Sequence, residues 1–318
     1  MNIDSVCILG GTGFVGRHIA NRLANTDVRI KVLTSHPERN RHLLPIPNLR
    51  LHSANVHDET ALRRELADVD AVINLVGVLN DSNKPGSGFE AAHVELPDKL
   101  VSACRASGVG RLLHMSALGA DPEAPSRYQQ TKGRGEQRVM AAHGDDLAVT
   151  VFRPSVVFGR EDSFLNTFAG MLRVAPVLML PTPDARFQPV YVGDVADAFT
   201  DALGRRASFG HAYDLCGPEV YSLRELVEYC AATMGLKRRI IGLPDGLSRL
   251  QARVLERLPG KLYTYDNYLS STVDNVCSGN DMDALGIHPT GMDAVVPYYL
   301  GGRRQRQRYN DYRRVARR

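Results

Sequence analysis

The sequence predicts an α/β protein with a Rossmann-type, doubly wound parallel sheet and a smaller C-terminal lobe. Three observations support this fold class. A glycine-rich turn follows a short apolar run at the N-terminus. Runs of strand length then alternate with helical patterns along the first half of the chain, as in a parallel sheet. One of these runs, residues 70–77, is almost continuously apolar, as expected of a central parallel strand.

The glycine-rich turn is the strongest local signal. It lies between the apolar run 6–9 and a helical pattern over residues 14–25, and it reads Gly10-Gly11-Thr12-Gly13-Phe14-Val15-Gly16. Strand, glycine turn and helix in this order predict a dinucleotide site. The first glycines allow the tight turn, Gly13 lets the backbone approach a pyrophosphate, and Gly16 lets the helix lie close to the sheet. The N–H groups of the first helical turn would then face the phosphates.

The predicted second strand, residues 28–33, bears on the choice of cofactor. An NAD site usually places Asp or Glu at the end of this strand, on the ribose 2′-hydroxyl, and no acidic residue stands there. We expect Ser35, His36 and Arg39, with Arg17 from the first helix, to surround a 2′-phosphate. The alternative is that they are ordinary exposed loop residues. The pattern favours NADP(H) over NAD(H).

The next elements continue the alternation. The sequence predicts a third strand, a helix, a fourth strand, a long helix and a fifth strand over residues 48–54, 59–66, 70–77, 89–107 and 111–115. The long helix can contain Pro97 only with a local distortion. Val76 and Gly77 end the fourth strand, where Gly77 would let the backbone pass close to the cofactor.

Ser116 follows the fifth strand, and a helix predicted over residues 128–140 begins with Tyr128 and Lys132. Tyr and Lys at i and i+4 lie on one face of a helix. A nearby ammonium favours the phenolate, so we expect the pKa of Tyr128 to be lowered. Ser116 would orient a carbonyl or hydroxyl group while Tyr128 exchanges its proton, and Lys132 would also hold the nicotinamide ribose. No metal-ligand spacing is present.

The second half of the chain predicts a lobe built onto the sheet. We expect three regions: residues 1–150 as the NAD(P)-binding domain, 151–300 as the C-terminal strands and lobe, and 301–318 as a disordered tail. Asp194 is expected to cap a helix, and Ser222 with Glu225 to form a capping box. The amphipathic pattern over residues 248–258 predicts a helix that closes over the core, with a membrane or partner surface as the alternative.

Cysteines and charge suggest where the protein works. The five cysteines are scattered and form no CxxC pair, which predicts reduced thiols and a cytoplasmic protein. Residues 301–318 hold eight arginines and one aspartate, so this tail carries +7 and the remaining chain −3. Such a tail suits an anionic membrane surface or an acidic protein face. Nucleic acid is disfavoured because the body is acidic and few aromatic residues are interleaved.

These motifs together resemble the short-chain dehydrogenase/reductase superfamily, in its atypical, extended branch. The stretches 126–136, 158–166 and 188–195 are similar to the NADPH-binding accessory subunits of respiratory complex I and their bacterial relatives. The resemblance implies a Rossmann core holding NADP(H), with Gly10, Gly13 and Gly16 at the pyrophosphate and Lys132 at the ribose. Ser35 stands where such NADPH sites often have an arginine.

The resemblance also implies partners and a set of functions. It points to complex I or quinone-biosynthesis proteins, at the inner membrane as a peripheral protein. The chain would be either a reductase using Tyr128 and Lys132 or a structural nucleotide binder. A sugar-nucleotide epimerase or dehydratase is the alternative enzyme, and a nucleotide-sensing assembly protein that docks through its tail is the alternative from another class.

Overall fold

The computed structural model describes residues 1–81, 88–257 and 263–301, so the basic tail lies outside the described residues apart from Gly301. The chain forms two compact units. The first comprises Met1–Ser155, Val192–Cys216 and Cys277–His288. The second comprises Val156–Tyr191, Gly217–Val276 and the chain from Pro289 onward.

The first unit is built on a seven-stranded sheet with the order β11-β6-β5-β4-β1-β2-β3, and all of its strand pairs are parallel. The strands are β1 (Ser5–Leu9), β2 (Arg29–Thr34), β3 (Leu49–Ser53), β4 (Ala71–Asn74), β5 (Arg111–Met115), β6 (Ala148–Pro154) and β11 (His211–Leu215). The expected doubly wound parallel sheet is therefore confirmed.

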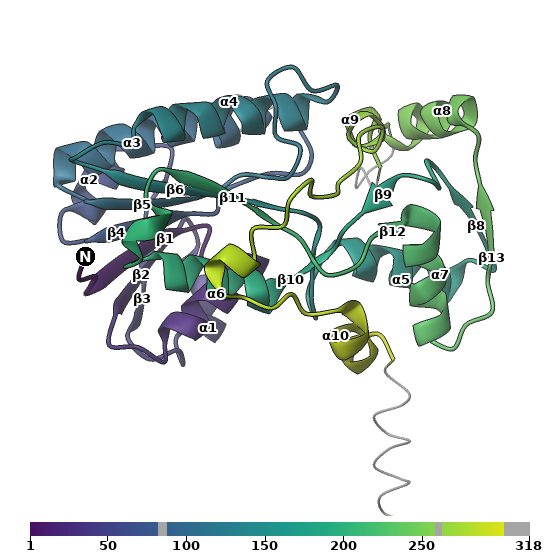
Figure 1. Ribbon diagram of the computed structural model, residues 1–318, viewed down its shortest axis with the longest axis horizontal. Coiled ribbons are helices and arrows are strands. Elements are labelled where there is room, and N and C mark those ends of the chain that lie inside the picture. The colour runs from purple at the N-terminus through teal and green to yellow at the C-terminus, as the bar shows by residue number, and fades with distance from the viewer. Residues whose placement is uncertain (82–87, 258–262, 302–318) are drawn as a thin grey trace, which may run out of the picture. The chain divides into compact units, whose positions relative to one another are not determined.

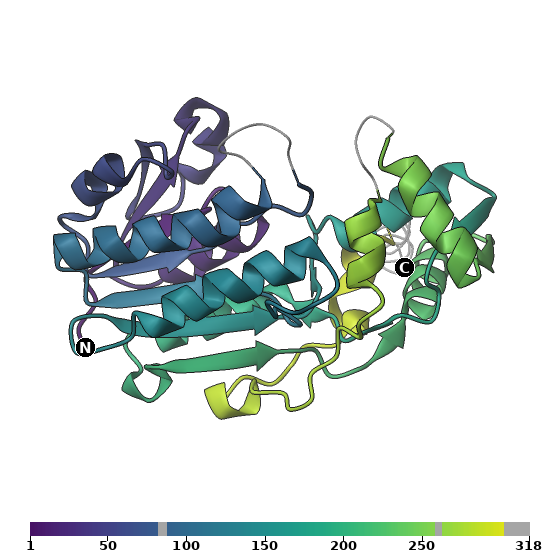
Figure 2. The same ribbon diagram turned by 90° about the horizontal axis from the view of Figure 1, so that it is seen from above.

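Helices cover both faces of this sheet (Figure 1). One face carries α2 (Glu59–Leu66), α3 (Leu96–Ser107) and α4 (Arg127–Ala141), and the other carries α1 (Phe14–Leu23) and α6 (Val192–Ala202). Figure 2 shows α3 and α4 lying side by side along the strands. Buried aliphatic side chains from the strands and from α2, α3 and α4, such as Leu9, Leu66 and Leu100, form the core between these helices and the sheet.

The expected distortion near Pro97 is confirmed. A π-helical turn, Ala91–Glu95, precedes α3, which has its proline in the first turn. Helix α4 lies very close to the backbone of this turn, because a Cβ atom on Gly135 of α4 would lie 1.8 Å from the carbonyl oxygen of His93. The turn and the glycine together let the two helices pack around His93.

The second unit contains short strands and five helices within the described residues. Its strands form three two-stranded sheets: β7 (Val157–Phe158) with β10 (Val190–Tyr191), β9 (Arg186–Phe187) with β12 (Tyr221–Ser222), and β8 (Val177–Leu180) with β13 (Arg239–Gly242). The helices are α5 (Phe164–Val174), α7 (Leu223–Thr233), α8 (Asp245–Leu255), α9 (Tyr265–Ser270) and α10 (Met292–Tyr299). Residues of α5, α7 and α10, including Leu165, Leu226 and Val296, form its core.

Two local expectations have different outcomes. Ser222 and Glu225 form the expected capping box at the start of α7. Asp194 is not a helix cap, because α6 already begins at Val192 and places Asp194 inside its first turn. Its carboxylate still lies near the positive end of the helix dipole.

The expectation that all five cysteines stay reduced is wrong. Cys216 and Cys277 form a disulfide, with Cα atoms 6.2 Å apart and a sequence separation of 61. Cys216 follows the end of β11, and the amide of Asn280 hydrogen-bonds both the N–H and the carbonyl of Cys216, so the segment that starts at Cys277 is held against it. Cys7, Cys104 and Cys230 are free and buried.

No helix in the described ranges is long and apolar enough to cross a bilayer.

Candidate functional site

The glycine turn adopts the geometry that a phosphate-binding turn needs. Gly10, directly after β1, has φ +75°, and it lies close to the residue after β4, because an added Cβ atom would lie 3.0 Å from the carbonyl carbon of Leu75. Gly13 precedes α1 and donates its N–H to the carbonyl of Gly10 at 3.0 Å. No side chain caps the N-terminus of α1 in the part of the chain that the structure describes. The first-turn N–H groups are therefore available to an anion.

The rest of the turn brings α1 onto the strand. A Cβ atom on Gly16 would lie 2.5 Å from the Cα atom of Gly11, so only glycine allows this approach. Gly11 and Val15 are buried, and Thr12 and Phe14 are partly buried. The glycines thus let the turn pack against Leu75 and let α1 approach the turn backbone, as a dinucleotide-binding turn requires.

The residues expected around a 2′-phosphate lie at the end of β2 and on α1. Ser35, His36 and Arg39 are exposed, and Arg17 is partly buried with its Nε atom donating to the carbonyl of Gly13 at 3.3 Å. The imidazole Nδ1 atom of His36 lies 3.3 Å from a carboxylate oxygen of Glu38. A negative group therefore stands among the expected phosphate ligands.

The segment after β4 is held by two buried side chains. Asn74 accepts the N–H of Val76 at 3.1 Å through its Oδ1 atom and donates its Nδ2 group to His114 Nδ1, also at 3.1 Å. His93 Nε2 accepts the N–H of Val78 at 3.1 Å. Gly77 lies between these anchors, and an added Cβ atom would lie 3.6 Å from His93. The backbone that follows β4 is thus fixed from both sides.

Because His93 accepts through Nε2, its proton lies on Nδ1, which donates to the Thr131 hydroxyl at 3.0 Å. Burial, with a smaller effect of the Lys132 charge, lowers the pKa of His93 to about 3. Burial also lowers the pKa of His114 well below its usual value. Both imidazoles are therefore neutral at physiological pH and act as fixed hydrogen-bond partners.

Ser116, Tyr128 and Lys132 lie in the same unit, and Ser116 and Lys132 meet the end of β5. Ser116 directly follows β5 and is buried, and its Oγ atom has no hydrogen-bond partner among the described residues. Lys132 is buried on α4 and donates its Nζ group to the carbonyl of Met115 at 2.6 Å. Burial lowers the pKa of Lys132 to about 8, although the carboxylate of Glu136 opposes this shift.

The expected lowering of the Tyr128 pKa is wrong in direction. The partly buried ring of Tyr128 packs edge-on against Phe89 and His93, with centroids 5.8 and 5.5 Å apart. Burial of the phenol raises its pKa to about 12. Lys132 does not reverse this shift; its ammonium is directed to the Met115 carbonyl. Tyr128 is therefore a protonated phenol at neutral pH.

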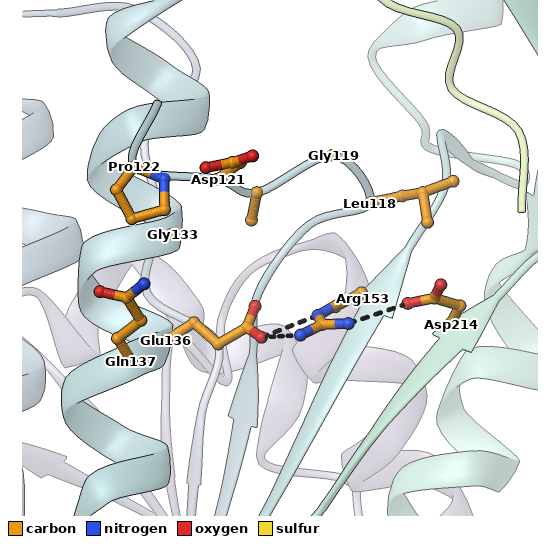
Figure 3. A pocket seen from close by; sticks show the side chains of 10 residues that line it. Leu118, Gly119, Asp121, Pro122, Gly133, Glu136, Gln137, Arg153 and Asp214 are labelled. Atoms are coloured by element: carbon orange, nitrogen blue, oxygen red, sulfur yellow. Dashed lines mark hydrogen bonds and ion pairs between the residues drawn. The ribbon is translucent and has the colours of Figure 1, made fainter. Parts of the chain in front are cut away.

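A cavity of about 300 Å³ opens one helical turn beyond Lys132 (Figure 3). Arg153, at the end of β6, points between two carboxylates: its Nε atom donates to Glu136 Oε1 at 2.7 Å, and its other side lies 3.6 Å from Asp214 Oδ1. Glu136 raises the pKa of Arg153. The other lining residues are Leu118, Gly119, Ala120, Asp121, Pro122, Gly133 and Gln137.

Sequence reasoning missed the polar residues that support this site. Asn74, His93, Thr131 and His114 are buried and hydrogen-bonded to one another in pairs or to the backbone. Asn74 gives the one available signal, since a polar residue in an otherwise apolar strand needs a buried partner. His93 itself lies in a π-helical turn, and its partners come from the segment after β4 and from α4, which no spacing in the sequence reveals.

Comparison with known proteins shows the family of the chain. The family described as "NAD dependent epimerase/dehydratase family" matches residues 6–216. The chain is 28% identical to "NADH dehydrogenase (ubiquinone) 1 alpha subcomplex subunit 9, mitochondrial" of Arabidopsis thaliana, over 93% of this chain and 78% of the relative. It is 27% identical to "2-alkyl-3-oxoalkanoate reductase" of Stenotrophomonas maltophilia, over 73% of this chain and 76% of the relative.

Among solved structures, the crystal structure of gox2253 superposes with a TM-score of 0.75. The two chains are 22% identical, and the match covers 95% of this chain and 98% of the other. At this identity the likeness bears on the fold alone.

Proposed function

The chain belongs to the NAD dependent epimerase/dehydratase family, and from this premise we propose that it is an NADP(H)-dependent reductase of a carbonyl substrate. The observation that carries the proposal is Ser116, whose buried hydroxyl lacks a hydrogen-bond partner within the described residues. An unmet buried hydroxyl costs stability unless a ligand uses it. A substrate carbonyl beside Tyr128 would use it.

The side chains support reduction. The hydride for the carbonyl carbon would come from dihydronicotinamide when the cofactor is bound. Tyr128, whose pKa of about 12 keeps the phenol protonated, donates its proton to the carbonyl oxygen. Ser116 donates a hydrogen bond to the same oxygen, and Lys132 holds the ribose. The carbonyl π bond breaks as C–H and O–H bonds form, and the product is an alcohol.

The test of catalysis is a pair of substitutions. Tyr128→Phe should abolish NADPH oxidation with a panel of ketone and quinone substrates, while the protein still binds NADPH in a fluorescence titration. Ser116→Ala should lower kcat by about a hundredfold or more, as expected for loss of a group that polarises the carbonyl. Loss of nucleotide binding together with turnover in Tyr128→Phe would instead support a structural nucleotide binder.

The preference for NADP(H) rests on Ser35, His36 and Arg39, which follow β2, and on Arg17 of α1. The positive charge of the two arginines would attract a 2′-phosphate. Glu38 is the observation that favours the second candidate, a sugar-nucleotide epimerase or dehydratase that retains NAD, because a carboxylate beside His36 disfavours a 2′-phosphate. Identification of the nucleotide released on denaturing freshly purified protein separates the two. Stoichiometric NADP(H) supports the reductase, and tightly held NAD supports the epimerase.

We infer from its relatives that the protein works beside the respiratory chain, as a peripheral protein at the cytoplasmic face of the inner membrane. A relative aligned over most of both chains is a mitochondrial NADH dehydrogenase subunit. Complex I or a quinone-biosynthesis protein is the proposed partner, and the arginine-rich tail outside the described residues is a proposed contact with anionic lipid. Comigration with complex I on a native gel of solubilised membranes would support the association.

A further inference from the structure

Helix α8 of the second unit turns three large apolar side chains toward solvent. Leu247, Leu250 and Val254 are 50%, 57% and 52% exposed, while Ser248 and Ala252 are completely buried. The helix therefore packs through its small residues and the partly buried Leu255, and the expectation that Leu250 and Val254 close over the core is wrong. Three large aliphatic side chains at positions i, i+3 and i+7 form one exposed stripe.

This stripe continues onto a neighbouring sheet of the same unit. Gln251, one helical turn from both Leu247 and Val254, donates its amide to the carbonyl of Met179 on β8 at 3.2 Å. Met179 and Val177 are exposed on β8, and Ile241 is exposed on β13, where it pairs with Met179. We call Leu247, Leu250, Val254, Val177, Met179 and Ile241 the α8 surface.

Positive charge borders the α8 surface. Arg249 and Arg253 are exposed one helical turn apart on the side of α8 next to the apolar stripe, and Arg257, just beyond the end of the helix, is also exposed. The guanidinium groups of Arg249 and Arg253 lie over the ring of Tyr265 on α9, 5.7 and 5.0 Å from its centroid, so they are held in place (Figure 1 shows α8 beside α9). Arg239, also exposed, pairs with Val177 at the other end of the surface.

The acidic residues of the helix do not cancel this charge on the apolar side. Asp245 accepts the hydroxyl of Tyr268 at 2.6 Å, and Glu256 accepts the N–H of Tyr265 at 3.4 Å. Both carboxylates are thus directed toward α9. The apolar stripe of α8 therefore has arginines beside it, while these two exposed carboxylates are held by residues of α9.

We propose that the α8 surface rests on an anionic lipid bilayer, with Leu247, Leu250 and Val254 at the acyl boundary and the arginines at the headgroup phosphates. Exposed aliphatic residues beside a basic stripe are the features of an interfacial helix. A second copy of this chain is a poorer occupant, because a self-complementary contact would bring arginines against arginines. The inference extends the peripheral association proposed above to a folded contact, and it stands without the catalytic proposal.

The experiment uses the absence of tryptophan from the sequence. In the full chain, Leu250→Trp places a single fluorophore on the α8 surface, and Leu44→Trp places one at an exposed apolar position of the first unit. On mixing with phosphatidylglycerol vesicles, Leu250→Trp emission should shift to the blue and be quenched by lipids brominated along the acyl chain. Leu44→Trp emission should change little, and phosphatidylcholine vesicles should cause no shift in either variant.

A second pair of variants measures affinity. Leu250→Asp combined with Val254→Asp should weaken cosedimentation with anionic vesicles at least about tenfold, whereas Leu44→Asp should not. Cosedimentation with unshifted Leu250→Trp emission would overturn the proposal and assign the contact to another part of the chain, such as the tail. Absence of vesicle binding would overturn it as well. NADPH titration of the same samples tests the cofactor proposal separately, so either proposal can fail alone.

Discussion

Single residues at this site are tuned by burial more than by neighbouring charge. Burial raises the pKa of Tyr128 to about 12 and lowers the pKa of Lys132 to about 8. The tyrosine and the lysine are both moved toward their neutral forms, because transfer from water disfavours charge. A neutral phenol is a proton donor, which fits reduction of a carbonyl better than oxidation of an alcohol.

His93 allows this effect to be measured. Its pKa is about 3 in the folded protein and about 6.5 when unfolded, so the unfolded chain binds the extra proton between these values. Stability should therefore fall as pH drops below about 6.5, by up to about 1.4 kcal/mol per pH unit from this group. Urea denaturation at about pH 7 and about pH 5 should show a loss about 2 kcal/mol smaller in His93→Gln than in the natural protein. Equal losses in both proteins would contradict a neutral, buried His93.

At the scale of elements, the alternation of strands and helices was predictable because one physical pattern determines it. The predicted strand 111–115 and helix 59–66 match β5 and α2 residue for residue. Side-chain direction was harder to predict. The sequence of α8 does not show which side of the helix faces the rest of the protein. Only the surrounding packing decides that Ser248 and Ala252 face inward. The same holds for Tyr128, whose environment depends on Phe89 and His93 from a distant segment.

Two helical glycines give a matched prediction for the packing of elements. Gly16→Ala in α1 should destabilise the protein by about 1–3 kcal/mol and weaken NADPH binding, because the new methyl group would meet the Gly11 backbone. Gly170→Ala in α5 should stabilise it by about 0.5–1 kcal/mol, since nothing lies within 4 Å of an added Cβ atom there. Thermal denaturation and NADPH titration of both variants provide the measurement. Tolerance of Gly16→Ala in both assays would contradict the close approach of α1 to the turn.

At the scale of the whole molecule, the chain passes from one unit to the other and back again, and no sequence pattern reveals where it does so. Residues 277–288 come back to the first unit after about sixty residues in the second. Nothing in the spacing of five scattered cysteines distinguishes Cys216 and Cys277 from the other three, which lie in apolar segments of strands or helices and are buried. The dinucleotide turn and the Ser116, Tyr128 and Lys132 set could be predicted from the sequence because each is local or falls at a strand end.

The disulfide gives a prediction for the stability of the whole fold. Because the bond between Cys216 and Cys277 closes a long loop, it restricts the unfolded chain, and its loss should lower the free energy of unfolding by about 2–4 kcal/mol. Cys277→Ser should show this loss in urea denaturation. Dithiothreitol should destabilise the natural protein by a similar amount and leave Cys277→Ser unchanged, which separates the bond from other effects of the substitution. Cys230→Ser, at a free buried thiol, is the control that should keep its sensitivity to the reductant. If the natural protein were equally stable with and without dithiothreitol, the bond would not contribute to holding residues 277–288 on the first unit.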